Sequence, residues 1–244
     1  MSARPCIVIP AFNEAAPLAA LLAELQRTLP DHELVVIDDG SRDRSAEIAA
    51  QAGARVLRHP YNLGDGAALQ TGFKYALESG APWVVQMDAD GQHLPAEVPT
   101  LVAALASGDC DVAIGSRFLA PSGYEMGALR TTGRQLIRAL GRLANLDLTD
   151  PTSGFQALNR RALALYVGDW FPTDYPDVDV RLVAARSGLR IREIPVQMAP
   201  SARVSTLHSG WKPLYYAYKM LLSLWAVTSK RPPQQTTPPN APPA

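Results

Sequence analysis

Asp88-Ala89-Asp90-Gly91-Gln92-His93 directly follows the apolar run Trp83-Val84-Val85-Gln86-Met87. This apolar run predicts a buried strand, so the two acids fall at its carboxyl end, where an open α/β sheet binds ligands. Two carboxylates one residue apart, followed by a glutamine, offer the oxygen ligands that Mg²⁺ or Mn²⁺ prefers, and such an ion usually bridges to phosphate oxygens. Taken alone, the stretch is equally typical of an acidic turn after a strand.

The first half of the chain alternates predicted strands with predicted helices. Short apolar runs predict strands at 6–9, 34–37, 55–57, 83–87 and 111–115. Helical spacing predicts helices around the leucines from Leu18 to Leu29, in a segment that ends near Gln51, and at 67–77 and 98–105. Strands that alternate with helices predict an α/β fold, with a parallel sheet covered on both faces.

The composition narrows the class of protein. The 244 residues carry no formal net charge and are 47% hydrophobic, which suits one substantial core and argues against nucleic-acid binding. The two cysteines have neither disulfide nor zinc spacing, and the chain shows no secretory signal pattern. No apolar run reaches the roughly 18–20 residues that span a bilayer. We therefore expect a cytoplasmic protein, either soluble or held peripherally at the inner face of the membrane.

Polar groups follow three successive strands, at 10–14, 38–41 and 88–92. The first strand lacks the Gly-x-Gly-x-x-Gly turn of a dinucleotide fold, and the chain has no Walker A loop. Residues 62–67 form a glycine-rich turn into a helix, which either lets a ligand approach the backbone or is simply a turn. Acids and a predicted metal ion at one crevice indicate a nucleotide-diphosphate site.

Four motifs occur in a familiar order, at 9–14 (IPAFNE), 38–41 (DDGS), 88–93 (DADGQH) and 152–155 (TSGF). Over roughly residues 5–205 the chain resembles family 2 glycosyltransferases, in the branch with dolichyl-phosphate mannosyltransferase and bacterial polyprenyl-phosphate glycosyltransferases. The resemblance implies a GT-A fold, which is an α/β fold with a mostly parallel sheet flanked by helices. It also implies inverting transfer from a nucleotide-diphosphate sugar.

The resemblance implies a nucleotide pocket between the first two strand ends. Pro10, Phe12 and Glu14 would line the base and ribose pocket on one side. Ile37 and Asp39 would close the other side, with Asp39 accepting a hydrogen bond from the base.

The same resemblance assigns the diphosphate and its metal ion. Asp88 and Asp90 would hold Mg²⁺ or Mn²⁺ with help from Gln92, and Ala89 completes this donor-binding motif. The ion neutralises charge on the leaving nucleoside diphosphate. Arg117 matches an arginine that contacts the donor, although a surface arginine near a loop is the simpler interpretation.

The second half is expected to bind the acceptor. Arginines recur every fourth residue beside a leucine face, at Arg130, Arg134, Arg138 and Arg142. Such a helix lies on an anionic membrane, receives an acceptor phosphate, or is a solvated face over packed leucines. Asp150 begins the acceptor-side motif, so the resemblance places it near the transfer point, whereas an Asp-Pro turn that stops a helix is the alternative.

Two acids near the start of a later helix are candidates for a catalytic base. Asp177 and Asp179 either favour the helix N-terminus or provide the base that many relatives keep, and Asp179 falls nearer the usual glutamate of the family. A strand is expected at 191–196. Relatives then have an arginine and a Gly-x-Ser-Lys-like segment that clasps the diphosphate. Here Arg203 is the only cation of 201–206, which leaves the donor identity open.

The tail separates into two parts. Residues 211–227 are apolar and aromatic on one helical face, which suits docking to a bilayer, capping the core or forming a dimer. The following residues are proline-rich and polar and should be disordered. We therefore expect a catalytic domain at 1–210, an amphipathic helix at 211–230 and a disordered tail at 231–244.

Three functions follow from these patterns. The first is sugar transfer to a polyprenyl phosphate, whose second pKa of about 6 leaves it ionised without a strong base. The second is transfer to a sugar hydroxyl of a cell-surface glycan, where a carboxylate must take the proton. The third is a non-enzymatic nucleotide-sugar-binding protein, which the intact acids disfavour.

Overall fold

The computed structural model of the chain describes residues 4–119, 148–174 and 176–200. Several predicted features lie outside these residues, namely the arginine stripe from Arg130 to Arg142, Arg203, the helix at 211–230 and the tail at 231–244. Within the described ranges, no helix combines the length and the apolar character that crossing a membrane requires.

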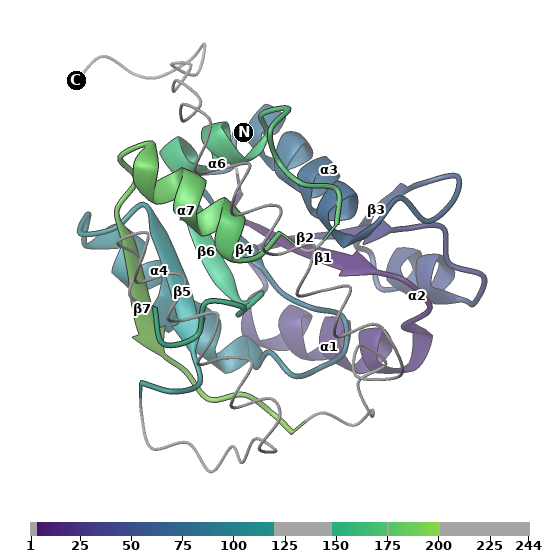
Figure 1. Cartoon of the computed structure of the whole chain (residues 1–244). Coiled ribbons are helices and arrows are strands. Elements are labelled where there is room, and N and C mark those ends of the chain that lie inside the picture. The colour runs from purple at the N-terminus through teal and green to yellow at the C-terminus, as the bar shows by residue number, and fades with distance from the viewer. Residues whose placement is uncertain (1–3, 120–147, 175, 201–244) are drawn as a thin grey trace, which may run out of the picture.

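The described residues form a central seven-stranded sheet in the order β3-β2-β1-β4-β6-β5-β7 (Figure 1). The strands are β1 (Cys6–Ala11), β2 (Glu33–Asp38), β3 (Arg55–Arg58), β4 (Trp83–Gln86), β5 (Val112–Ser116), β6 (Gln156–Asn159) and β7 (Ile191–Pro195). Only β6 runs antiparallel to its neighbours, β4 and β5. The predicted α/β fold with a mostly parallel sheet is confirmed.

Helices cover both faces of the sheet (Figure 1). One face carries α3 (Asp65–Glu78), α6 (Arg160–Tyr166) and α7 (Val178–Arg186), and the other carries α1 (Ala15–Thr28), α2 (Ser45–Gln51), the 3₁₀ turn η1 (Pro95–Glu97) and α4 (Val98–Ala106). Successive strand residues point to opposite faces. Val8 therefore shares a core with Phe73 of α3, whereas Ile7 and Ile9 share the other core with Leu22 of α1.

The first strand continues through Pro10, where the sequence predicted its end. The Ala11 carbonyl accepts from Asp39 N–H on the β2 side, and the Val8 carbonyl accepts from Met87 N–H on the β4 side. Alternate strand residues bond to opposite neighbours, so Pro10 faces the same side as Val8. The pairing of β1 with β4 ends at Val8, so the missing N–H of Pro10 costs no ladder hydrogen bond.

The sequence did not predict β6 or α6. The strand is only four residues long and has a polar residue at each end, so it lacks an apolar run. It is stabilised by a buried partner, because the Gln156 amide donates to the Gln86 side-chain oxygen at 2.7 Å across the β4–β6 pair. The turn after β6 is fixed by Asn159, whose side chain accepts from Ala162 N–H and caps α6.

Candidate active site

The loops after β1 and β2 are joined by hydrogen bonds between their side chains and backbone. Asn13 N–H donates to Ser41 Oγ at 2.9 Å, and Arg42 N–H donates back to Asn13 Oδ1 at 2.9 Å. Glu14 N–H donates to Ser45 Oγ at 2.9 Å. Asn13 has a φ of 57°, a left-handed conformation that asparagine tolerates better than most residues. The first two predicted strand ends therefore form one rigid wall.

A cleft of about 870 Å³ opens beside this wall. It is lined by Phe12, Asn13, Gly40, Ser41, Arg42, Arg58, His59, Pro60, Tyr61 and Asn62. The Phe12 and Tyr61 side chains are exposed at 43% and 66%, although both are aromatic. Gly40 has a φ of 73°, and a Cβ there would lie 2.6 Å from the Tyr61 backbone. Exposed aromatic faces in a cleft of this size suit a planar ring such as a nucleobase.

Asp39 anchors the far wall of this cleft. Its Oδ1 accepts from His59 Nδ1 at 2.7 Å and from Leu63 N–H at 2.9 Å, and its Oδ2 accepts from Gly64 N–H at 3.0 Å. A carboxylate offers about four acceptor sites, so one site on Oδ2 remains beyond these three bonds. Asp39 thus holds the loop of residues 59–64, and its side chain is only 4% exposed.

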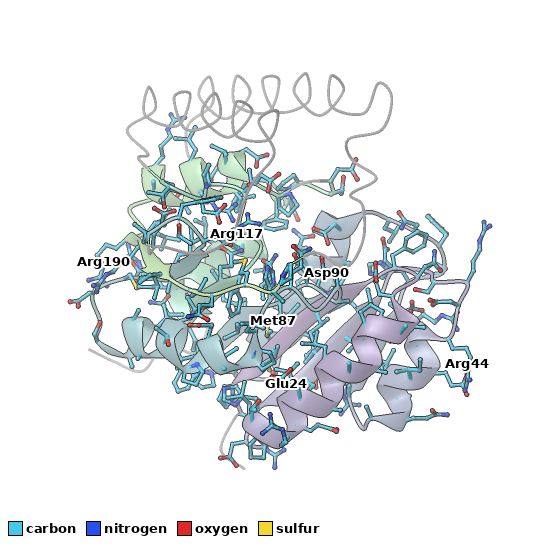
Figure 2. All side chains as sticks on the ribbon, turned by 90° about the horizontal axis from the view of Figure 1, so that it is seen from below. Glu24, Arg44, Met87, Asp90, Arg117 and Arg190 are labelled. Atoms are coloured by element: carbon cyan, nitrogen blue, oxygen red, sulfur yellow. The ribbon has the colours of Figure 1, made fainter. Side chains whose placement is uncertain are left out.

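The acids after β4 lie at the centre of the crevice. Asp90 Oδ1 accepts from Gln92 N–H at 2.9 Å, and its Oδ2 accepts from the Gln92 side-chain amide. His93 Nδ1 accepts from Asp88 N–H at 2.9 Å. Figure 2 labels Asp90 near the middle of the view, with Arg44 at the periphery. The turn therefore holds the Asp90 carboxylate and the backbone of Asp88.

Negative charge accumulates around Asp88. Burial raises the pKa of Asp88 to about 7, and repulsion by Asp90 and Asp177 adds to this, whereas Arg117 opposes it. The side chain itself is 44% exposed, but it lies in a hollow where protein replaces much of the surrounding water. The pKa of Asp65, at the start of α3, is likewise raised to about 7 by the surrounding protein and then by Asp88, Asp177 and Asp39, although the residue itself is exposed. The charges of acids from four segments therefore act on one another.

A cation would relieve this repulsion. Among the described residues, no three His, Cys, Asp or Glu side chains gather closely enough to hold a metal ion by themselves. Asp88 and Asp90 are two hard oxygen donors, and a Mg²⁺ or Mn²⁺ ion commonly completes such a pair with phosphate and water oxygens. The donor set therefore fits a divalent ion that arrives with a diphosphate.

Arg117 and Asp150 form an ion pair at the end of β5. Arg117 Nε donates to Asp150 Oδ2 at 2.8 Å, and Nη2 donates to Oδ1 at 3.0 Å. Asp150 is only 1% exposed, and its backbone N–H donates to Glu193 of β7 at 2.7 Å. Both oxygens of Asp150 are engaged by the guanidinium, so the two residues form one unit beside Asp88.

The two acids near the start of α7 differ in their surroundings. Asp179 is buried, and its Oδ1 accepts from the backbone N–H groups of Asp177 at 3.1 Å and Val180 at 2.8 Å. Asp177 is half-buried, and its charge raises the pKa of both Asp88 and Asp65. Asp179 thus stabilises the helix start, whereas Asp177 lies toward the crevice.

The family is identified by comparison with known proteins. A family model described as Glycosyl transferase family 2 matches residues 6–166. The chain belongs to this family. It is 33% identical over 205 residues to the undecaprenyl-phosphate mannosyltransferase of Micrococcus luteus, covering 79% of this chain and 82% of that one. It is 29% identical over 209 residues to the polyprenol monophosphomannose synthase of Mycolicibacterium smegmatis, covering 79% and 76%.

A solved structure supports the fold of this family 2 glycosyltransferase. Glucosyl-3-phosphoglycerate synthase from Mycobacterium tuberculosis, crystallised with Mn²⁺, UDP-glucose and phosphoglyceric acid, matches with a TM-score of 0.70 at 21% identity. The match covers 93% of this chain and 80% of that one. The predicted GT-A fold is thereby confirmed. Because the family consists of transferases, the alternative of a non-enzymatic binding protein falls away.

Other residues of the glycosyltransferase were singled out only by the structure. Arg181 of α7 is 1% exposed and donates to the Asp177 carbonyl at 2.7 Å and to the Ser153 carbonyl. It therefore ties the acceptor-side motif to the segment that carries Asp177. An arginine within a helix gives no such signal in the sequence, because most are exposed.

The sequence allowed two interpretations of the glycine-rich turn at 62–67, namely close approach of a ligand to the backbone or a simple turn. A Cβ at Gly64 would lie 2.5 Å from Asp174 Oδ1, and one at Gly66 would collide with the Pro172 carbonyl. Ala67 N–H also donates to the Thr173 carbonyl at 3.1 Å. The two glycines thus make room for residues 172–174, which lead to Asp177, and the turn packs against protein.

Proposed function

We propose that this glycosyltransferase moves a sugar from a nucleotide-diphosphate sugar to the phosphate of a polyprenyl phosphate, with inversion at the sugar carbon. One observation carries the choice of acceptor: Arg117 engages both oxygens of Asp150, so this acid is poorly placed to deprotonate a hydroxyl. An ionised phosphate attacks without such help. The names of the two curated relatives, which act on undecaprenyl phosphate or make a polyprenol phosphomannose, point the same way.

The donor would lie along the edge formed by β1, β2 and β4. The nucleobase would stack in the cleft between Phe12 and Tyr61, and the remaining acceptor site of Asp39 would bond to it. Pro10, Glu14 and Ile37 are the other proposed members of this pocket. Of these, Pro10 and Ile37 lie opposite each other in the β1–β2 pair.

Asp88 and Asp90 would hold Mg²⁺ or Mn²⁺ on the diphosphate. Such an ion would neutralise the charge that builds on the leaving nucleoside diphosphate. Gln92 would act through Asp90, because its backbone and side-chain amides both bond to that carboxylate. Ala89 is 3% exposed and packs into the core, so it fixes the turn between the two acids.

Arg117 would provide the fixed positive charge of the site. Asp150 holds the guanidinium in one plane, and the positive charge lowers the pKa of Asp88, so Arg117 would lie near the diphosphate if Asp88 binds the metal ion. A charge that is already oriented costs little reorganisation when the leaving group departs. Asp150 would then act as a positioning residue.

A second acceptor class is favoured by one residue. Asp177 lies close enough to Asp88 and Asp65 to raise their pKa values, so its carboxylate would be near the proposed point of transfer. If a sugar hydroxyl of a glycan attacks, Asp177 would be the general base. Asp179, which is buried on backbone amides, fits this role less well.

The acceptor is tested directly with purified protein and Mn²⁺. UDP- and GDP-sugars are offered with either undecaprenyl phosphate in detergent or a methyl glycoside, and the products are identified by mass spectrometry. We expect a glycosyl phospholipid from one nucleotide sugar and no disaccharide. Transfer to the methyl glycoside, with no lipid product, would replace the first acceptor by the second.

A further inference from the structure

His93 contacts Asp88 at two points. Its Nδ1 accepts the backbone N–H of Asp88 at 2.9 Å, so this nitrogen carries the lone pair. The proton of the neutral ring then sits on Nε2, which lies 3.5 Å from Asp88 Oδ2. One imidazole therefore faces both the backbone and the carboxylate of the same residue.

The imidazole ring has little freedom to move. It stacks on the Phe155 ring, with 4.8 Å between centroids and 14° between planes, and Phe155 is completely buried. His93 is itself 4% exposed. Its backbone forms a bridge to Met198, and Ala199 N–H donates to the neighbouring Gln92 carbonyl at 2.9 Å. The ring is thus fixed by Phe155 just before β6, by the segment after β7 and by its own turn.

Asp88 needs such a support. Its carboxylate faces the like charges of Asp90 and Asp177, which would favour any rotamer that turns away from them. Gly154 lies directly behind it, since a Cβ at that position would be 3.0 Å from Asp88 Oδ1. The neutral Nε2–H, 3.5 Å from Oδ2, restricts where the carboxylate can turn without cancelling the charge that a cation requires.

We propose that His93 is a positioning residue that fixes the Asp88 carboxylate for a divalent cation. This inference rests on the proposed function, because it needs the metal site at Asp88 and Asp90. Outer-shell partners of ligating groups orient them, and their loss commonly weakens metal binding about 10–100-fold. A ring that only filled space against Phe155 would not require its nitrogens.

Substitutions can separate positioning of the Asp88 carboxylate from simple packing against Phe155. His93→Phe keeps a ring to stack on Phe155 and removes both nitrogens, whereas His93→Asn keeps an oxygen near Nδ1 and lacks the donor at Nε2. His32→Phe is the matched control, because His32 precedes β2 at the opposite edge of the sheet from Asp88. The dissociation constant of Mn²⁺ is measured by electron paramagnetic resonance with UDP or GDP, whichever the parent binds. Circular dichroism and Tm report the fold.

We expect His93→Phe to bind Mn²⁺ about 10–100-fold more weakly, with a raised KM for Mn²⁺ and a smaller change in kcat at saturating Mn²⁺. His93→Asn should lie between this variant and the parent, and His32→Phe should match the parent. If His93→Phe does not fold, His93→Asn decides. Folded His93 variants with the affinity of the parent would overturn this inference alone. A parent that binds no Mn²⁺ would overturn the proposed metal site as well.

Discussion

The Arg117 guanidinium holds both oxygens of Asp150, at 2.8 and 3.0 Å, and so joins the end of β5 to the acceptor-side motif. The sequence predicted separate roles for these residues, Arg117 as a donor contact and Asp150 as a group near the transfer point. Because Arg117 acts on Asp88, the pair would link the proposed donor side of the site to the proposed acceptor side.

Breaking this pair should impair both stability and donor binding. Asp150→Ala leaves the guanidinium, which is 20% exposed, without its carboxylate, and such a loss costs on the order of 3 kcal/mol. We expect a lower free energy of unfolding in urea and a raised KM for the nucleotide sugar. In a double-mutant cycle with Arg117→Ala, the losses should be non-additive by roughly 0.5–3 kcal/mol. Strictly additive losses would mean that the residues act independently.

Activity should depend on Mg²⁺ or Mn²⁺ through Asp90. Asp90→Ala should abolish turnover while Tm stays near that of the parent, because Asp90 bonds only to Gln92 of its own turn in the described structure. Asp109→Ala is the control, since that side chain is 66% exposed and lies beyond α4. Full activity of Asp90→Ala in the presence of chelator would remove the metal assignment.

The stability of the metal-free protein should fall as pH rises from about 4 to 7. The protein around Asp65 raises its pKa from 3.8 to about 7, although the residue is exposed and water screens part of this effect, so in this window the folded state keeps a proton that the unfolded state has lost. Asp65→Asn should therefore flatten the decrease in Tm between pH 5 and pH 8, as measured by calorimetry without metal. A variant with the same pH dependence as the parent would show that Asp65 does not titrate there.

The binding of Mn²⁺ at Asp88 should also depend on pH. Asp88, whose pKa is also raised to about 7, should bind Mn²⁺ more tightly at pH 8 than at pH 5.5, because protons compete below pH 7. The increase in Tm on adding Mn²⁺ should therefore be larger at the higher pH. An equal increase at both values would argue that Mn²⁺ binds elsewhere.

The sheet was predictable because its strands are short apolar runs that end in polar motifs. β1 is buried over its whole length, and so is all of β2 after its first residue. Strands of a parallel sheet that is covered on both faces are continuous apolar runs in the sequence. β6 was missed because the Gln156 side-chain amide bonds to the Gln86 side-chain oxygen inside the core, a pairing that no local pattern shows. Asp65 was missed for a related reason, since only the tertiary fold brings it toward Asp88 and Asp177.

The individual acids were located better than their roles. Spacing placed Asp88 and Asp90 at a strand end, and the fold brings Arg117 toward Asp88. The spacing did not show that Arg117 engages both oxygens of Asp150, or that Asp179 bonds to backbone amides. Those pairings depend on residues more than 30 positions apart or on the exact start of α7.

Membrane association remains a prediction from the sequence. The arginine stripe from Arg130 to Arg142 and the segment at 211–227 lie outside the described residues. We expect binding to anionic liposomes that weakens with salt, since the screening length falls to about 3 Å at 1 M. Removing residues 211–244 should release the protein in a flotation assay. Equal binding of the truncated chain would place the anchor elsewhere.

The choice of acceptor can be decided at the start of α7. Asp177→Asn should cost little when a lipid phosphate attacks, because that nucleophile is already ionised at neutral pH. With a hydroxyl acceptor, the loss of a general base should lower kcat by roughly 10²–10⁴-fold. Asp179→Asn serves as the comparison, because its carboxylate bonds to the backbone N–H groups of Asp177 and Val180 and its loss should mainly lower Tm.

Both variants are assayed with the acceptor that the parent uses, and nucleotide binding is checked by calorimetry. A kcat within a few-fold of the parent for Asp177→Asn, with lipid phosphate as acceptor, would support the proposed reaction. A loss beyond a hundredfold with donor binding intact and a hydroxyl acceptor in use would instead make Asp177 the base of a glycan-directed transferase. Of the two acids, Asp177 is the better candidate for this base. Its charge raises the pKa of Asp88, and that of Asp179 does not.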